Sequence, residues 1–514
     1  MEDILNKARI YEKENEGKID KERPSFHLTP RVGWMNDPNG FCYYKGKYHM
    51  FYQYHPYDNH WGPMHWGHAV SSDLLHWEYL PVALAPDKEY DKRGCFSGSA
   101  VELPDGRHLI MYTGVSEMTL ADGKKVDCQT QCVAVGDGVE YVKYENNPVL
   151  TSEDVPEGGS YIDFRDPKLW VSEDGTIYCI VGNRSSDTSG QMLLYKSMDG
   201  FKWEFVRILV RNRNSFGKMW ECPDFFCQNG EWVLLTSPQD MEAVPGRYNS
   251  GNGTLALIGR WDTKDSEFVP KNDQCIDNGI DYYAPQTVLT PDGRRIMIGW
   301  MQNWDTCNSY VPSDKWCGQM ALPREITVKD GRLYQLPAKE IENMRGALNS
   351  VLNMKLKGTY SADILNGRKA DLTVKVRSSG EHGYDDFEIR FFEGKDNASE
   401  STSKDKAPES ASKADDTNYA FVKYDARKSE VTLSREYAGV RRAIVNKTSC
   451  KVDDMNGQIE FRIILDKYSA EVFINGGKYA MTMNVYNAPC FDGISFMADG
   501  EVMVDILKYD LDKD

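Results

Sequence analysis

Three carboxylic acids occupy the same position relative to a glycine. Asp37, Asp166 and Glu221 each stand nine residues before a glycine that opens a short apolar segment. The glycines concerned are Gly46, Gly175 and Gly230. If the fold brings the acids together, like charges raise at least one pKa, and one acid then tends to hold a proton. Glycoside hydrolysis needs such a pair, because one acid protonates the leaving oxygen while another attacks or stabilises.

The same acids fit two other interpretations. They could be hydrogen-bonded acids at strand ends, or oxygen ligands of a calcium ion. Trp and Tyr residues crowd the surrounding segments, and aromatic side chains suit the faces of sugars. We therefore favour a catalytic site over a metal site, and expect no metal ion.

The glycines belong to an internal repeat that predicts the architecture. Five segments share a turn with Gly followed by a short apolar strand: YKGKYHMFYQ, PDGRHLIMYTG, EDGTIYCIVGN, QNGEWVLLTS and PDGRRIMIGW. Their glycines are 60, 69, 55 and 63 residues apart, and each stands where a tight hairpin needs positive φ. A unit of this length holds about four strands, which is the content of one propeller blade. Glycine hairpins also recur by chance in β proteins, but the near-regular spacing favours a five-bladed β-propeller.

A second repeated pattern marks the equivalent outer strand in two different blades. Four residues recur with the same spacing: Ser71, Asp73, Trp77 and Glu78 match Ser197, Asp199, Trp203 and Glu204. Counting back nine residues in the two remaining blades reaches Ser97 and Ala284. Because equivalent positions on the first strands surround the central channel of a propeller, we expect the three acids to converge at one mouth of it.

The rest of the chain completes an all-β fold. Residues 25–336 are the expected propeller, 337–351 a connector, and 352–514 a C-terminal β-sandwich with alternating strands. Residues 394–418 are rich in Ser, Lys, Asp, Glu and Ala without an aromatic residue, so we expect a disordered insert. Residues 1–24 are expected to form a polar extension, in which Met1 to Lys21 is either a polar helix or frayed.

The charge and composition of the chain limit the partners that it can bind and the compartment in which it works. Lys and Arg number 61 against 78 Asp and Glu, giving a net charge of −17, which argues against nucleic acid. The charged N-terminus has no apolar stretch like a signal peptide, and no window approaches a membrane span. We expect a cytoplasmic protein whose 12 cysteines are mostly reduced. The oligomeric state stays open.

Four motifs give the chain a family resemblance. They are Trp34-Met35-Asn36-Asp37-Pro38-Asn39-Gly40, Phe96-Ser97-Gly98-Ser99, Arg165-Asp166-Pro167 and Glu221-Cys222-Pro223. In this order and spacing they resemble the signature of glycoside hydrolase family 32, the invertases and fructanases, which include sucrose-6-phosphate hydrolases. The resemblance implies a five-bladed propeller that carries the active site and a β-sandwich that follows it.

The resemblance also implies roles for individual residues. Asp37 would be the nucleophile, Glu221 the acid/base and Asp166 the stabiliser of the transition state, with Arg165 orienting the acids. The residues that match the fructose pocket are Asn36, Gln53, Trp61, Phe96 and Ser97, with Tyr283 and Trp300 as further candidates for its wall. The implied reaction releases fructose from a small β-fructofuranoside with retention, through a covalent fructosyl-enzyme and without a cofactor. Sucrose, sucrose 6-phosphate and short fructo-oligosaccharides all remain open as substrates.

Two rival functions remain. The box Ser197-Met198-Asp199-Gly200 with Trp203 resembles a sialidase hairpin, but a sialidase needs an arginine cluster and a tyrosine nucleophile, where the counted positions supply acids. A non-catalytic sugar-binding propeller would have no reason to keep three acids in register. The acids therefore favour the fructosidase.

Overall fold

The protein forms two compact units. The computed structural model describes residues 3–16, 23–262, 264–307, 313, 315–379, 383–395, 417–439, 445–453 and 455–511. The first unit comprises Met1–Asp277 and Asp281–Ile341, and the second comprises Asn278–Ile280 and Glu342–Asp514. The part of the expected insert between 396 and 416 lies outside the described residues.

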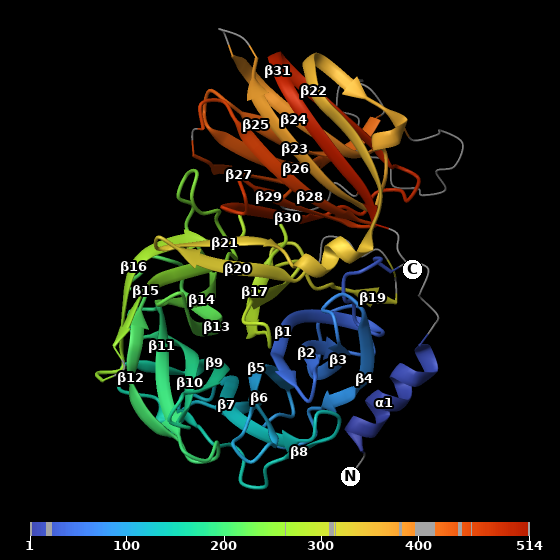
Figure 1. The fold of residues 1–514 in the computed structure, drawn as a ribbon. Helices are drawn as coiled ribbons and strands as arrows, with labels where there is room; N and C mark the ends of the chain where they lie inside the picture. The colour runs from blue at the N-terminus through green and yellow to red at the C-terminus, as the bar shows by residue number, and fades with distance from the viewer. Residues whose placement is uncertain are drawn as a thin grey trace. The chain divides into compact units, whose positions relative to one another are not determined.

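Within its described residues, the first unit is the expected five-bladed propeller (Figure 1). The first blade contains β1 (Gly33–Tyr44), β2 (Lys47–His55), β3 (His65–Ser71), β4 (Trp77–Leu84) and the short β19 (Trp316–Cys317). The second contains β5 (Gly94–Glu102), β6 (His108–Thr119), β7 (Lys125–Gly136) and β8 (Tyr141–Lys143). The third contains β9 (Gly159–Val171), β10 (Ile177–Ser185), β11 (Gly190–Ser197) and β12 (Glu204–Arg211), with the one-turn η2 (Ser152–Asp154) before it.

The last two blades close the ring. The fourth contains β13 (Met219–Gln228), β14 (Glu231–Gln239), β15 (Leu255–Asp262) and β16 (Glu267–Cys275). The fifth contains β17 (Tyr283–Leu289), β18 (Arg295–Trp300), β20 (Arg324–Lys329) and β21 (Arg332–Pro337). The first strands β1, β5, β9, β13 and β17 contact one another in sequence and β17 returns to β1, while β19 pairs in parallel with β1. Five strands from distant parts of the sequence therefore surround one centre.

The repeat glycines make the hairpins between the first and second strands. Gly46 and Gly293, in the first and last blades, have φ of 82° and 83°. No atom lies within 4 Å of a Cβ added at either position, so the left-handed backbone alone selects glycine there. The second repeated pattern also marks equivalent strands, as expected. Asp73 and Asp199 each accept two backbone N–H bonds in the turns that lead to β4 and β12.

The second unit has the expected sandwich character. A short helix, η3 (Lys339–Met344), precedes β22 (Arg345–Ser361), η4 (Asp363–Leu365), β23 (Ala370–Ser378), β24 (Tyr384–Lys395), β25 (Thr417–Asp425), β26 (Glu430–Tyr437), β27 (Lys447–Lys451), β28 (Ile459–Asp466), β29 (Ser469–Ile474), β30 (Tyr479–Asn484) and β31 (Gly493–Leu511). The long β31 pairs with β24 along its first half and with β23 along its second, so one strand joins both halves of the sheet. Phe387, Phe461 and Phe496 are fully buried in its core. Since β22 begins at Arg345, the connector is shorter than the expected 337–351.

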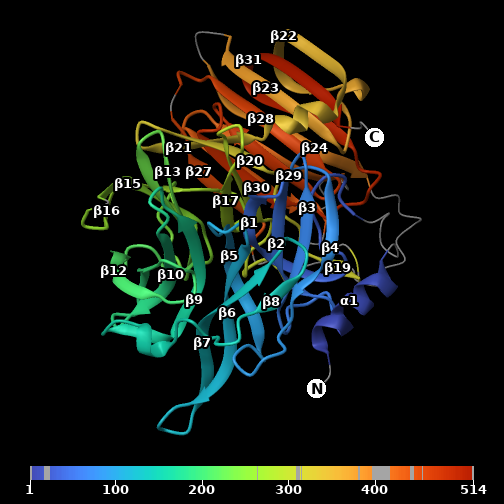
Figure 2. The same ribbon diagram turned by 60° about the horizontal axis from the view of Figure 1, so that its bottom comes forward.

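The N-terminal stretch contains a helix that packs on the propeller. Helix α1 (Ile4–Asn15) runs beside β4 (Figure 1, Figure 2). The Arg9 guanidinium donates to the Val82 carbonyl at 3.0 Å, and Glu12 is buried, which raises the pKa of this carboxyl to about 7. Over Ile4–Asn15 the polar extension thus takes the helical form, one of the two that the sequence predicts. In the described part of the chain, no helix is long and apolar enough to cross a membrane.

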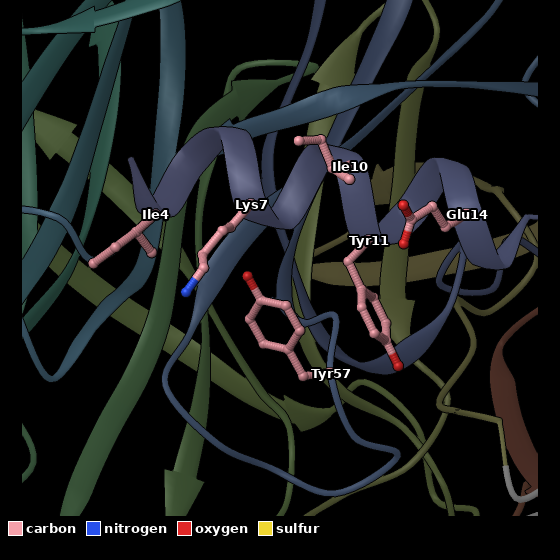
Figure 3. Close-up of a pocket in the computed structure, with 6 residues that line it drawn as sticks. All are labelled: Ile4, Lys7, Ile10, Tyr11, Glu14 and Tyr57. Atoms are coloured by element: carbon pink, nitrogen blue, oxygen red, sulfur yellow. The ribbon is translucent and has the colours of Figure 1, made fainter. Parts of the chain in front are cut away.

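A pocket of about 390 Å³ lies between α1 and the loop after β2 (Figure 3). Its lining residues are Ile4, Lys7, Ile10, Tyr11, Glu14 and Tyr57. None of the three acids and none of the predicted substrate-binding residues contributes to it. This pocket is therefore separate from the predicted catalytic residues.

Candidate active site

A β-bulge interrupts the first strand of every blade within one residue of the same point. The interrupted pairings lie after Met35, Phe96, Arg165, Glu221 and Tyr283. The backbone is left-handed at three of the bulges, with φ of 66° at Asp166, 47° at Cys222 and 51° at Ala284. A bulge bends a strand and redirects its side chains. The repeat therefore reproduces both the position of the functional residue and the local distortion that aims it.

The two aspartates meet at Cys222. The Cys222 thiol lies 3.4 Å from Asp37 Oδ2 and 3.7 Å from Asp166 Oδ2, and its backbone N–H donates to Asp166 Oδ2 at 3.0 Å. Ser97 Oγ donates to Asp37 Oδ2 at 2.8 Å. Side chains from four blades thus converge, as the counting argument predicts. Sequence reasoning assigned no role to Cys222, although it forms part of a quoted motif.

Burial and charge shift the proton affinity of both aspartates. Burial raises the pKa of Asp37 to about 6, and the nearby charge of Glu221 acts in the same direction. Burial and Glu221 also raise the pKa of Asp166, although Arg165 opposes this shift. The rise in pKa that is expected of close acids is therefore present at Asp37 and at Asp166.

Glu221 is held by three donors from three different strands. Arg165 Nε on β9 donates to Oε1 at 3.0 Å. Gln239 Nε2 at the end of β14 and the Tyr283 hydroxyl at the start of β17 donate to Oε2 at 2.9 and 2.8 Å. Arg165 also forms an ion pair with Asp163 at 3.2 Å, which helps to hold its guanidinium in place. No sequence signal pointed to Gln239, since it belongs to no quoted motif.

The other predicted substrate-binding residues include two buried amides, Asn36 and Gln53, and one exposed aromatic side chain, Trp61. Asn36 Oδ1 accepts from the Trp34 indole at 2.8 Å, and the Gln53 amide donates to the Cys95 carbonyl at 3.0 Å. Trp61, with 48% of its surface exposed, makes an edge contact with Phe96 and can present a ring face to a ligand.

Tyr283 and Trp300, the further candidates for the pocket wall, are both buried. Both side chains have no exposed surface, and their rings pack against each other with centroids 6.5 Å apart. Trp300 packs in addition on Trp34. Neighbouring atoms of the protein therefore cover both rings in this structure.

Comparisons with known proteins agree with this geometry. Residues 27–337 match the model of the Glycosyl hydrolases family 32 N-terminal domain, and residues 340–511 match that of the Glycosyl hydrolases family 32 C terminal. Among curated proteins, the chain is 36% identical to a raffinose invertase of Escherichia coli, covering 90% of this chain and 89% of that protein. It is 34% identical to a sucrose-6-phosphate hydrolase of Escherichia coli, covering 94% and 93%.

Solved structures extend the likeness to the fold. A GH32 beta-fructofuranosidase of Bombyx mori is 31% identical, with a TM-score of 0.79 and coverage of 99% of this chain and 98% of that one. A sucrose-6-phosphate hydrolase of Lactobacillus gasseri is 25% identical, with a TM-score of 0.80 and coverage of 99% and 96%. Since the two family models together span nearly all of the sequence, this chain belongs to glycoside hydrolase family 32.

Proposed function

We propose that the protein is a retaining β-fructofuranosidase with Asp37 as nucleophile and Glu221 as acid/base. One observation carries the assignment of the nucleophile. Asp37 Oδ2 is held by Ser97 and Cys222, whereas Asp37 Oδ1 is buried and accepts no hydrogen bond from any described residue. An oriented carboxylate with one oxygen free of donors is suited to attack an anomeric carbon.

The reaction follows from this arrangement. Asp37 Oδ1 forms a bond to the anomeric carbon of the fructofuranosyl group while Glu221 gives its proton to the departing glycosidic oxygen. The glycosidic bond breaks, and the fructosyl group is held on Asp37. Glu221, now ionised, takes a proton from water, which attacks the same carbon and releases fructose with net retention. An alcohol in place of water would give transfructosylation.

Asp166 is assigned to the stabilisation of the transition state. Its backbone N–H donates to Thr113 Oγ1 at 2.9 Å and its carboxylate accepts from the Cys222 N–H, so its orientation is set before substrate binds. Its position beside the nucleophile lets it bind fructose hydroxyls as the ring carbon becomes positive.

We expect Asp166→Asn to lower kcat for sucrose by about 10²-fold while KM changes by less than about threefold, because the lost interaction strengthens in the transition state. Initial-rate kinetics over a range of sucrose concentrations measure both constants. An effect confined to KM would make Asp166 a simple binding residue.

The substrate is proposed to be a small β-fructofuranoside: sucrose, sucrose 6-phosphate or a short fructo-oligosaccharide. The names of relatives support this range, since they include raffinose invertase, sucrose-6-phosphate hydrolase and levanase. We also propose a cytoplasmic location, supported by the free thiols of all twelve cysteines, which the described residues include.

Release of reducing sugar from sucrose tests the proposed activity. We expect fructose and glucose as products, with kcat/KM compared for sucrose, sucrose 6-phosphate and kestose to rank the substrates. Cleavage of an aryl sialoside without action on any fructoside would instead support the sialidase rival. Binding of these sugars without turnover would support a non-catalytic propeller.

A further inference from the structure

The Tyr283 hydroxyl lies between two acceptors. It is 2.8 Å from Glu221 Oε2 and 3.0 Å from the backbone carbonyl oxygen of Ser237. A phenol has one hydrogen, so it can donate to only one of them at a time. Burial and the charge of Glu221 raise the pKa of Tyr283 well above its ordinary value, so this hydrogen stays on the phenol. The hydrogen bond therefore has two alternative directions.

The other groups that face Glu221 lack this choice. Arg165 presents N–H groups and has no acceptor, and Gln239 in this orientation presents the N–H of its amide, so neither accepts a hydrogen bond from a carboxylic acid unless Gln239 turns its whole amide over. Asp37 and Asp166 bear on Glu221 through their charges, and the Cys222 thiol is turned to these two aspartates. Among the described side chains that hydrogen-bond Glu221, Tyr283 is therefore the one that can change from donor to acceptor by turning its O–H alone, because a second acceptor is already in place.

We infer that Tyr283 is a positioning residue whose hydroxyl hydrogen follows the protonation of Glu221, an inference that rests on the acid/base role proposed above. When Glu221 is a carboxylate, Tyr283 donates to Oε2. When Glu221 carries the proton, Tyr283 turns its hydrogen to the Ser237 carbonyl, and its oxygen faces the acid as an acceptor. No covalent bond of Tyr283 changes, and the proton that reaches the leaving oxygen comes from Glu221.

This arrangement predicts the direction in which a substitution at position 283 moves the pH profile of activity. Tyr283→Phe removes a charge-assisted hydrogen bond from the ionised form of Glu221 and only a neutral one from the protonated form. The variant should therefore hold the Glu221 proton to higher pH. For sucrose, we expect the alkaline limb of the kcat/KM profile to move up by about 0.7 pH unit. A role in packing alone would change the amplitude of the profile and leave the limb in place.

Tyr282→Phe is the matched control. Tyr282 is the preceding residue and is also buried, but its ring packs against Gly299 and the Arg324 guanidinium, 4.2 Å from the ring centroid, rather than against Glu221. The same loss of one hydroxyl should leave the alkaline limb of sucrose hydrolysis where it is in the wild type. A limb that moved equally in both variants would overturn the inference.

A second substitution tests the opposite direction. 3-Fluorotyrosine at position 283, introduced by codon suppression, keeps both hydrogen bonds but is a stronger donor, so it should favour ionised Glu221 and move the limb to lower pH. It also keeps the inference testable if circular dichroism shows that Tyr283→Phe does not fold. Movement of the limb upward with fluorotyrosine, or no movement in either folded variant, would overturn it.

A substrate with an acidic leaving group distinguishes a failure of this inference from a failure of the proposed function. An aryl fructoside with an acidic leaving group needs little protonation, so its kcat/KM should show no alkaline limb in wild type or variants. A limb that persists with the aryl donor would count against the acid role of Glu221 itself. A limb seen with sucrose alone, but unmoved by both changes at position 283, would leave that role intact and reject only the role of Tyr283.

Discussion

Asp37→Asn should lower kcat for sucrose by roughly 10⁴-fold or more while making the folded protein more stable at neutral pH. The substitution keeps the size of the side chain and removes the attacking oxygen. In the native protein this carboxylate is buried beside Glu221 and Asp166, and no cation pairs with it among the described residues. Loss of its charge therefore relieves repulsion at the cost of catalysis.

The pH dependence of this stability gain follows from the raised pKa. Asp37 titrates at about 6 in the folded protein against an ordinary value of 3.8, so the folded state binds its proton more tightly than the unfolded chain. Ionisation therefore costs stability as pH rises from about 4 to about 6, and the full penalty, up to about 3 kcal/mol, is present above pH 6. Thermal melts should show the gain at pH 7.5 and its disappearance near pH 4.

Asp224→Asn provides the control for the stability measurement. Asp224 is also buried, but it pairs with Lys168 at 2.9 Å, so removal of its charge leaves a buried ammonium unpaired. This variant should be less stable than the wild type at pH 7.5, opposite in sign to Asp37→Asn. More than a tenth of the wild-type kcat in Asp37→Asn would exclude Asp37 as the nucleophile.

Glu221→Ala should nearly abolish hydrolysis of sucrose but spare the first step with an activated aryl fructoside. The sugar leaving group of sucrose departs poorly without a proton, whereas an acidic phenol needs little help. The fructosyl-enzyme on Asp37 should then accumulate, because no base activates water. Rapid mixing should show a burst of phenol, and mass spectrometry of the quenched enzyme should show the added fructosyl mass on the peptide that contains Asp37.

Azide should restore turnover in Glu221→Ala. The substitution leaves the Arg165 guanidinium, the Gln239 amide and the Tyr283 hydroxyl without their shared acceptor, and these donors can hold an anion in the vacated space. Azide needs no base, so it should attack the intermediate and give β-fructosyl azide with retained configuration. Asp37→Ala should form no covalent intermediate from any donor. Rescue of Asp37→Ala to an inverted product, with Glu221→Ala inert, would require the two roles to be exchanged.

Much of the fold was predictable because its signals are local. A glycine with φ near 80° at each first hairpin is a demand of the turn itself, and its recurrence in five segments set the number of blades. A polar helix was one of the two forms expected at the N-terminus, but the polar sequence of α1 gives no sign that Glu12 is buried against the propeller. The start of β22 at Arg345 was missed for a similar reason, because most of this strand is exposed and lacks a clear apolar alternation.

By itself the sequence determined which residue types stand at equivalent points of the five repeats, and so that Asp37, Asp166 and Glu221 face one centre. Only the tertiary structure decided how each acid is held. Cys222 between the two aspartates, and Arg165, Gln239 and Tyr283 around Glu221, come from strands far apart in the chain. Their contacts depend on bulges that turn single side chains toward the centre, and on burial that removes water from the acids. The spacing of residues along a chain does not show where a side chain points or how far it is buried. The orientation of the Tyr283 hydroxyl toward Glu221 could therefore be seen only in the folded protein.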